Sequence, residues 1–303
     1  MSVSQNPDVI GVDLGGTNLR AAVIDRMGQI VARRVAATPY EDGAFGPPER
    51  LIEAIIECVR PLLTAYPHVK AVGVGSGGQF NPKTGHCLGI NTGDPRFIGF
   101  PIGERLAAAL NLPVCIDNDV KMAAFGELRL GAGRDFQDLL CVAVGTGIGG
   151  ALILGGKLFH GHSGLAGHLG LFPDAQSGIR IEAIAGGVPL GNIALARGIL
   201  AVGETTERLF NLARSGNTDA AALIRDAAAS LGRVLAGLSY TVQPEAILIG
   251  GSVGLQPEYV QVIDEMLRLY MLPAWQTIRV IPMTLGTDAG MIGAGLCARE
   301  MFN

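Results

Sequence analysis

Two glycine-rich turns in this sequence have the residue types of phosphate-binding loops. The first turn contains Thr17 and the second contains Thr146, and each follows a run of apolar residues that predicts a buried strand. Closely spaced glycines let successive backbone N–H groups converge on an anion, and a threonine hydroxyl adds another donor. If the two turns face each other across a cleft, they could together bind a triphosphate.

Asp13 lies where the first apolar run enters its turn. Mg²⁺ prefers a carboxylate together with waters and phosphate oxygens, so Asp13 is placed to hold this ion through water. Aspartate also commonly caps a turn by accepting hydrogen bonds from the backbone. The sequence leaves both roles open.

Three polar residues, Asp117, Asn118 and Asp119, close another apolar run directly before a predicted helix. An aspartate at such a junction often serves only to cap the helix. If the end of the strand faces a cleft, one carboxylate could instead accept a proton from a sugar hydroxyl while the neighbouring asparagine orients that hydroxyl. The sequence alone does not separate these roles.

Two further patterns resemble binding sites, one for a dinucleotide and one for zinc, but other features of the sequence argue against both. Residues 145–150 read G-x-G-x-x-G, but a strand-like run follows where a dinucleotide-binding loop needs a helix. His160, His162 and His168 lie close together in the sequence without nearby cysteines. We therefore expect neither a dinucleotide site nor a zinc site, and we place His160 and His162 on a surface loop.

The turns are connected by alternating strands and helices, which is typical of an α/β fold. The first half is expected to contain strands at 9–13, 19–25, 29–35, 69–75 and 114–117 and helices at 48–65, 101–110 and 120–128. The second half is expected to contain strands at 139–144, 151–154 and 246–249 and helices at 220–242, 259–271 and 290–301. Because both halves open with strand, glycine turn and strand, we infer an internal duplication.

Composition excludes several classes of function. With 23 basic and 27 acidic residues among 303, the net charge of −4 argues against nucleic acid as a partner. The five cysteines never form a C-x-x-C pair, which indicates reduced thiols in the cytoplasm, and the N-terminal residues show no secretory signal. Residues 139–156 are uncharged but include six glycines, so we expect no membrane span there.

Taken in order, six short motifs resemble those of the ROK family of bacterial sugar kinases. They are D-L-G-G-T-N at 13–18, N-D at 118–119, G-T-G at 145–147, G-L-A-G at 164–167, E-A at 182–183 and G-G at 250–251. The resemblance covers nearly the whole chain. Within the family, residues 164–170, 182–185, 250–255 and 288–290 are most similar to proteobacterial N-acetylmannosamine kinases.

The resemblance implies an actin-like ATPase fold, a duplicated ribonuclease H-like architecture whose two domains surround a central cleft and close over ATP and a hexose. We expect a smaller N-terminal domain at 1–117 and a larger one at 118–289, with the closing helix at 290–303 packing back on the first. It also implies Mg²⁺, a homodimer and a cytoplasmic enzyme without a membrane partner.

Roles for individual residues follow from the same resemblance. Asp119 would be the general base on a sugar hydroxyl, the 6-hydroxyl by analogy. The residues that would hold the sugar are Gly78, Asn91, Asn118, Asp119, His168 and Glu182. The residues that would hold the nucleotide are Gly15, Gly16, Thr17 and Asn18 in the first turn, Thr146 and Gly147 in the second, and Gly250 and Gly251 beside the adenosine.

The chain departs from the family pattern in one stretch. Most members read Gly-Glu-x-Gly-His before a cysteine-rich zinc module. In this chain His168 replaces the glutamate of that motif, Leu171 replaces its histidine, and 172–180 contains no cysteine. How Glu182 is positioned is therefore an open question. We expect N-acetylmannosamine as substrate, with a glucokinase or fructokinase as the alternative.

Two alternative functions, a sugar sensor and a sugar-responsive repressor, are not enzymatic. A sugar sensor without turnover is compatible with the missing zinc module, although the retained Asp119 argues against it. The family also contains sugar-responsive repressors with a DNA-binding segment before the first phosphate loop, but only twelve residues precede Asp13. We therefore expect a kinase.

Overall fold

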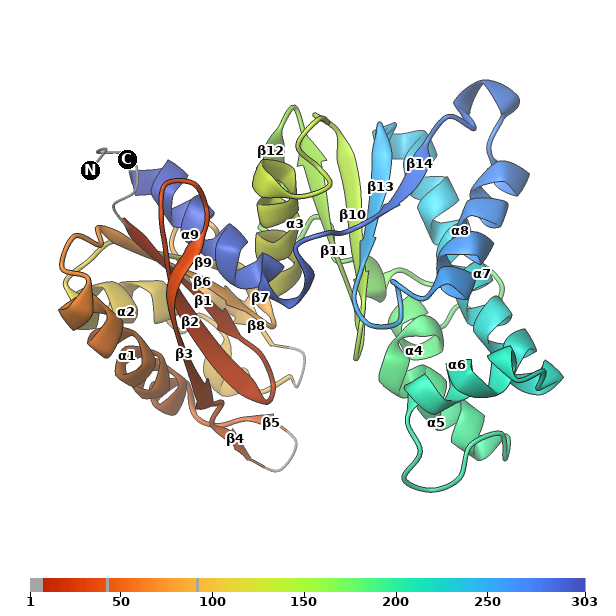
Figure 1. Cartoon of the computed structure of the whole chain (residues 1–303), viewed down its shortest axis with the longest axis horizontal. Coiled ribbons are helices and arrows are strands. Elements are labelled where there is room, and N and C mark those ends of the chain that lie inside the picture. Colours follow the sequence, from red (N-terminus) through yellow and green to blue (C-terminus); the bar gives the residue numbers. More distant parts are fainter. Residues whose placement is uncertain (1–7, 42–43, 91–92, 303) are drawn as a thin grey trace. The chain divides into compact units, whose positions relative to one another are not determined.

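The computed structural model describes residues 8–41, 44–90 and 93–302, and its contacts divide the chain into two units (Figure 1). The first unit comprises residues up to 134 together with 160–166 and 287 onwards. The second unit comprises 135–159 and 167–286. The division into domains at 1–117 and 118–289 stays a prediction, and the contact units place residues 118–134 with the first unit.

The first unit is built on a mixed five-stranded sheet in the order β3-β2-β1-β6-β9. Its strands are β1 (Val9–Leu14), β2 (Asn18–Ile24), β3 (Ile30–Ala37), β6 (Ala71–Ser76) and β9 (Val114–Asn118). β1 pairs antiparallel with β2, while β1, β6 and β9 run parallel. Asp13, Gly75 and Asp117 share one level of the register, so two of the polar strand ends lie at the same edge of the sheet.

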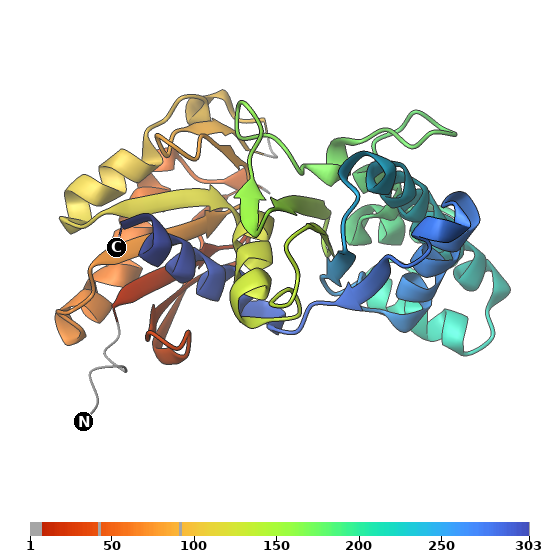
Figure 2. The same ribbon diagram turned by 90° about the horizontal axis from the view of Figure 1, so that it is seen from above.

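Helices cover both faces of this sheet. Those on one face are α1 (Pro48–Ala65) and α2 (Ile102–Leu110), and those on the other are α3 (Asp119–Leu130) and α9 (Ala289–Phe302). Figures 1 and 2 show α9 running alongside α3. A Cβ atom on Gly11 or Gly73 would lie 1.8 Å from a carbonyl oxygen of α9, so these glycines allow the helix to approach the sheet.

Smaller elements complete the first unit. They are β4 (Tyr40–Glu41), β5 (Ala44–Phe45), β7 (Gln79–Phe80), β8 (Cys87–Gly89) and η2 (Pro95–Phe97), and η5 (Gly286–Asp288) precedes α9. The predicted helix at 48–65 is confirmed, with Pro61 inside it.

The second unit repeats the arrangement of the first. Its sheet has the order β12-β11-β10-β13-β14, with β10 (Leu139–Val144), β11 (Ile148–Leu154), β12 (Lys157–Phe159), β13 (Ala246–Gly250) and β14 (Arg279–Pro282). β10 pairs antiparallel with β11 and parallel with β13, as β1 pairs with β2 and β6. This confirms the expected duplicated α/β architecture.

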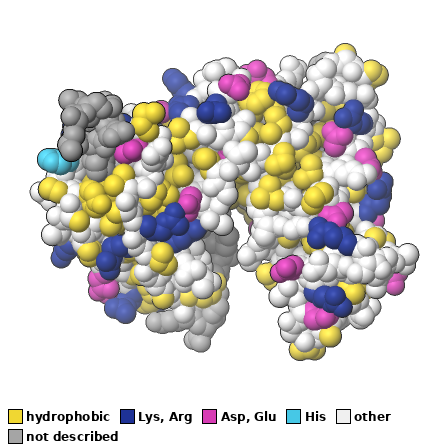
Figure 3. Space-filling view, in the orientation of Figure 1, with side chains coloured by type: hydrophobic (Ala, Val, Ile, Leu, Met, Phe, Trp, Pro, Cys, Tyr) yellow, Lys and Arg dark blue, Asp and Glu magenta, His cyan; other side chains and the backbone are white. Residues whose placement is uncertain are grey.

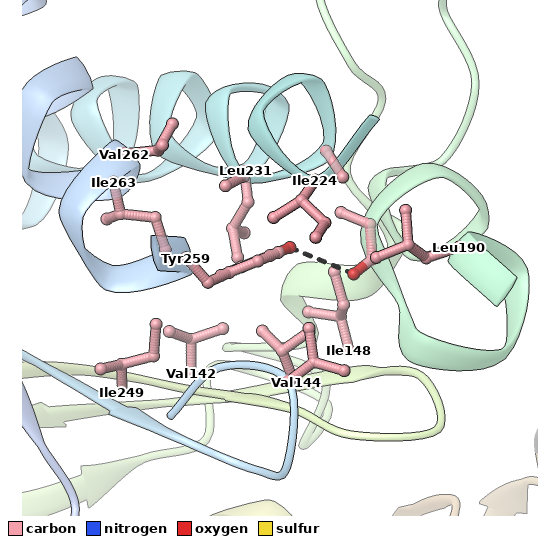
Figure 4. Close-up of a cluster of buried hydrophobic side chains, with 14 of the residues drawn as sticks. Val142, Val144, Ile148, Leu190, Ile224, Leu231, Ile249, Tyr259, Val262 and Ile263 are labelled. Carbon is pink, nitrogen blue, oxygen red and sulfur yellow. Dashed lines mark hydrogen bonds between the residues drawn. The ribbon is translucent and has the colours of Figure 1, made fainter. Parts of the chain in front are cut away.

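A large apolar core lies between this second sheet and its helices. The helices are α4 (Ile181–Ala185), α5 (Gly187–Ala196), α6 (Thr206–Arg214), α7 (Thr218–Val242) and α8 (Pro257–Tyr270), with short η3 (Leu169–Leu171) and η4 (Pro273–Trp275) segments. Tyr259 is fully buried, with Ile224 and Leu231 of α7 on one side and Val142 and Val144 of β10 on the other (Figure 4).

The predicted elements differ from the structure in the start of one strand and in several elements that the prediction did not contain. The strand predicted at 151–154 begins at Ile148, so the second glycine turn spans only 145–147. Helices α4, α5 and α6 and strands β12 and β14 were not predicted. α4 has five residues and β12 three, too few for a periodic pattern to be visible.

The surface carries charge of both signs. On the face drawn in Figure 3, basic and acidic side chains are interspersed among hydrophobic ones. Among the helices that the structure describes, none is long and apolar enough to cross a bilayer.

Candidate functional site

Asp13, one residue before the end of β1, forms an ion pair across the hairpin. It lies directly opposite Arg20 of β2 in the register, and the Arg20 guanidinium contacts its carboxylate. Burial raises the pKa of Asp13, the Arg20 charge opposes that shift, and the negative charge of Asp288 adds to it, so that the net direction is upward. The observed partner is thus Arg20, which the sequence reasoning did not assign to the site.

Asn118 joins two of the residues expected to hold the sugar. Its Oδ1 accepts the backbone N–H groups of Val120 at 3.0 Å and Lys121 at 3.3 Å, so Asn118 caps α3. Its Nδ2 donates to the carbonyl of Gly78 at 3.0 Å. Gly78 has φ +122°, and a Cβ there would lie 2.8 Å from the carbonyl oxygen of Gly89, so no side chain fits at this position.

Asp119 is the first residue of α3 and has a strongly altered acidity. Desolvation of its carboxyl group, followed by the negative charge of Asp13, raises the pKa of Asp119 to about 6. Its Oδ1 also accepts the N–H of Val120 at 2.8 Å. Gly290 of α9 lies beside both aspartates, since a Cβ on it would be 3.5 Å from Asp13 Oδ1 and 3.7 Å from the Asp119 carbonyl oxygen. A carboxylate with a pKa near neutrality is suited to general-base catalysis.

The segment 160–166 is attached to the residues around Asp119. His160 Nε2 lies 2.6 Å from Asp117 Oδ2, and the Asp117 side chain is buried. Lys121 is also buried and donates from Nζ to the carbonyl of Gly164 at 2.5 Å. His160 lies in a loop, as predicted, but its side chain is partly buried and pairs with a strand end 43 residues earlier, a contact that the sequence did not suggest. His162 is exposed, as expected.

The first glycine turn is open at its tip and held at its base. Gly15 N–H donates to the carbonyl of Asn18 at 3.0 Å, and Thr38 Oγ1 donates to the Gly15 carbonyl at 2.7 Å. Gly16, Thr17 and Asn18 are exposed. The tip of the turn is therefore open to solvent, as a loop that binds a phosphate group must be.

In the second unit, Glu182 lies directly on the second glycine turn. Its Oε2 accepts the backbone N–H of Ile148 at 2.9 Å. A Cβ on Gly147 would lie 2.4 Å from the same oxygen, so only glycine leaves room for the carboxylate. Thr146 is exposed, and its carbonyl accepts the N–H of Val188 at 3.0 Å. The structure thus brings a residue expected to bind sugar into contact with one expected to bind phosphate.

The Gly250 and Gly251 turn lies beside the same strand end. Gly250 ends β13 in register with Ala143 of β10. Gly251 has φ +84°, and a Cβ on it would lie 2.3 Å from the Val144 carbonyl oxygen. The two turns expected to contact nucleotide in this unit therefore start from neighbouring strands.

His168 precedes the short η3 segment and is partly buried. Its carbonyl accepts the N–H of Leu171 at 3.3 Å. Gly170 packs against Glu182, since a Cβ on it would lie 3.2 Å from the Glu182 Cβ. The residue two positions after His168 therefore packs directly beside Glu182. Asn91 lies outside the described residues.

Comparison with known proteins identifies the family. The sequence pattern of the ROK family matches residues 9–301. This chain belongs to the ROK family. The ROK chain is 34% identical to an N-acetylmannosamine kinase of Shigella flexneri, with 96% of this chain and 98% of the relative covered. It is 32% identical to a glucokinase of Streptomyces coelicolor, with coverages of 96% and 97%.

Solved ROK structures have the same fold. A ROK hexokinase from Thermus thermophilus is 32% identical, with a TM-score of 0.81 and coverage of 97% of this chain and 98% of that chain. A ROK glucokinase from Streptomyces griseus in complex with glucose and AMPPNP is 29% identical, with a TM-score of 0.75 and coverages of 96% and 99%. These findings confirm both the resemblance to the ROK sugar kinases and the actin-like ATPase fold.

The acidic residues of this ROK chain suit a cation bound through water. Asp13 and Asp119 both have raised pKa values, and each is affected by the negative charge of another aspartate, so a cation nearby would offset charge that is already unfavourable. Within the described ranges, no group of three or more His, Cys, Asp or Glu side chains could hold a metal directly. A single carboxylate with waters and phosphate oxygens is the arrangement that Mg²⁺ accepts.

Proposed function

We propose that this ROK protein transfers the γ-phosphoryl group of ATP to the 6-hydroxyl of N-acetylmannosamine. The observation that carries the proposal is Asp119, a carboxylate at the start of α3 with a pKa of about 6, next to an asparagine fixed by hydrogen bonds. The full-length similarity to an N-acetylmannosamine kinase supports the choice of sugar.

Asp119 would accept the proton of the attacking hydroxyl. Its pKa lets it be ionised at neutral pH and still take up a proton readily as the hydroxyl oxygen bonds to phosphorus. The Asn118 amide nitrogen carries two hydrogens, and donating one to Gly78 fixes the direction of the other. Asn118 would therefore orient a sugar oxygen beside the base.

The glycine turns would hold the nucleotide. Gly15, Gly16, Thr17 and Asn18 of the first turn and Thr146 and Gly147 of the second would donate hydrogen bonds to the phosphates. Gly250 and Gly251 would contact the adenosine side. Mg²⁺, held by Asp13 through water, would neutralise charge on the phosphates.

His168 and Glu182, with Asn91, would select the sugar. A neutral imidazole can donate one hydrogen bond and accept another, which suits an N-acetyl group that carries both a carbonyl and an N–H. Glucose is the second candidate substrate, because a glucokinase is 32% identical over nearly the whole chain.

A panel of sugars in a coupled ADP-release assay tests the proposal. We expect kcat/KM to be highest for N-acetylmannosamine, with glucose and fructose lower. A higher kcat/KM for glucose would instead make the protein a glucokinase. Sugar binding without any ADP release would indicate a sensor. We also expect a homodimer, which light scattering of the purified protein would test.

A further inference from the structure

The cysteine-free stretch 172–180 forms a turn organised around one buried carboxylate. Asp174 is 3% exposed, and its Oδ2 accepts the N–H of Ser177 and the Ser177 hydroxyl, each at 2.9 Å, and the N–H of Gln176 at 3.2 Å. The Asp174 backbone closes the turn, since its N–H donates to Ile179 and its carbonyl accepts from Gly178, both at 2.8 Å. The loop therefore has a defined conformation that depends on Asp174.

Arg233 of α7 ties this turn to the body of the second unit. Its Nη2 lies 3.2 Å from Asp174 Oδ1, 2.8 Å from Ser230 Oγ and 3.4 Å from Gln176 Oε1. The two side chains of the ion pair are 19% and 4% exposed, so water screens them less than it screens a surface pair. Burial raises the pKa of Asp174, but hydrogen bonds from Ser177 and Arg233 outweigh this effect and hold the pKa below its ordinary value.

The loop leads directly into α4, which carries Glu182. Ile181 N–H donates to the Phe172 carbonyl at 2.8 Å, and Pro173 pairs with Arg180 in a short antiparallel bridge. α4 has only five residues, and so short a helix has little stability of its own. Its direction therefore depends on its tertiary contacts, which are the burial of Ile181 and Ala185 in the apolar core and the hydrogen bonds at its two ends.

The two ends of α4 are held differently. At the far end, the buried Tyr259 hydroxyl donates to the Ala185 carbonyl at 3.1 Å, the dashed line in Figure 4. At the near end, the 172–180 loop makes the connection. The apolar side chains around this loop are largely exposed: Leu171 is 49% exposed, Phe172 39% and Ile179 52%. Ile181, the first residue of α4, is buried in the apolar core, whereas the loop before it is exposed, so the polar bonds of Asp174 hold the loop that leads into this buried residue.

We propose that Asp174 and Arg233 are positioning residues for Glu182. Their ion pair fixes the 172–180 loop, the loop fixes the start of α4, and α4 keeps the Glu182 carboxylate against Gly147 and Ile148. The consequence for the sugar rests on the proposed function, in which Glu182 contacts the substrate. Loss of the ion pair then weakens sugar binding more than it slows the chemical step.

Arg233→Met and Asp174→Asn test this. Arg225→Met is the matched control, because it removes an ion pair with Glu265 at 2.8 Å from the same helix, about two turns earlier. The first readout needs no substrate. It measures the amide hydrogen exchange of residues 171–185, and the exchange and NMR shift of the Ile148 amide, whose hydrogen bond is accepted by Glu182. The second readout is the sugar KM set against kcat.

In Arg233→Met we expect exchange in 171–185 and at Ile148 to rise about tenfold, the sugar KM to rise about tenfold and kcat to stay within about threefold. Arg233→Lys should recover part of both effects. Asp174→Asn should be intermediate, because its amide oxygen can still cap the turn while the charge is lost. Arg225→Met should match the unmodified protein in every readout.

Failure of this proposal can be told apart from failure of the proposed function. If Glu182→Gln leaves the sugar KM unchanged, the sugar-binding role of Glu182 is wrong, while the exchange at Ile148 still tests the ion pair. If Arg233→Met exchanges like Arg225→Met at Ile148, the positioning role is overturned. Faster exchange with an unchanged sugar KM would overturn the link to the substrate.

Discussion

The negative charge of Asp13 acts on Asp119 within the same unit. Together with desolvation it raises the pKa of Asp119 to about 6, while Arg20 is drawn to Asp13 rather than to the base. Gly290 of α9 lies beside both residues. The residue proposed to hold Mg²⁺ therefore adds to the effect of desolvation on the pKa of the residue proposed to accept the proton.

Asp119→Asn should lower kcat by about 10²-fold or more with little change in sugar affinity. Asparagine keeps the shape and the hydrogen-bonding oxygen but cannot take up a proton. Steady-state kinetics and a sugar titration measure the two effects. Asp219→Asn, also in the first turn of a helix but exposed, is the control and should leave turnover unchanged. Near-normal turnover in Asp119→Asn would remove the proposed base.

The pH profile should reflect the same carboxylate. Because Asp119 must be ionised to act, kcat/KM for the sugar should fall as the pH drops through about 6. In Asp13→Asn the lost negative charge should move that acid limb to lower pH, even if the maximal rate is smaller. An acid limb at the same pH in both proteins would show that Asp13 does not act on Asp119.

Much of the fold could be predicted because the sequence patterns are long. The strand at 139–144 and the helix at 48–65 are found where periodicity placed them. A helix cap was expected at the end of the strand that contains Asp117, but the capping residue is Asn118 and not an aspartate. Arg20 could also have been assigned to the site. It is a charged residue within an apolar strand of a hairpin whose short turn fixes the register, and that register places it opposite Asp13.

Other parts of the site leave no local signal. His160 meets Asp117 across 43 residues, and Glu182 meets Gly147 through a helix of five residues. These contacts depend on how loops pack, and loop packing is set by tertiary structure rather than by the period of apolar residues. The role of Asp174 was hidden for the same reason.

Asp119 should also limit stability at neutral pH. Its folded-state pKa lies above the ordinary value of 3.8, so the folded state is relatively most stable below about pH 4 and loses that contribution as the pH rises through about 6. Asp119→Asn should therefore increase the unfolding free energy at pH 8 by up to about 3 kcal/mol and raise Tm there. At pH 4 the substitution should change both quantities little. Thermal unfolding at both pH values tests this. A lower Tm at pH 8 would contradict it.

Zinc should be present in less than one equivalent per chain. The prediction comes from the absence of cysteine in 172–180 and from Leu171 in place of a histidine. Elemental analysis of protein purified without chelator measures the content. Added chelator should leave Tm unchanged, because no bound metal contributes to folding. Tight one-to-one zinc would show that His160, His162 and His168 contribute to an unexpected site.

His168→Glu should shift preference from N-acetylmannosamine toward glucose. A glutamate accepts hydrogen bonds from sugar hydroxyls, whereas an imidazole in its neutral form can donate one hydrogen bond and accept another, which suits an N-acetyl group near C1 or C2. A good hydrogen bond to a polar substrate group carries about 1–3 kcal/mol, so the ratio of the two kcat/KM values should change by roughly tenfold or more. His162→Glu adds the same charge at an exposed histidine and should leave the ratio unchanged. Equal losses on both sugars in His168→Glu would make His168 a packing residue beside Gly170 and Glu182, and glucose would then become the first candidate substrate.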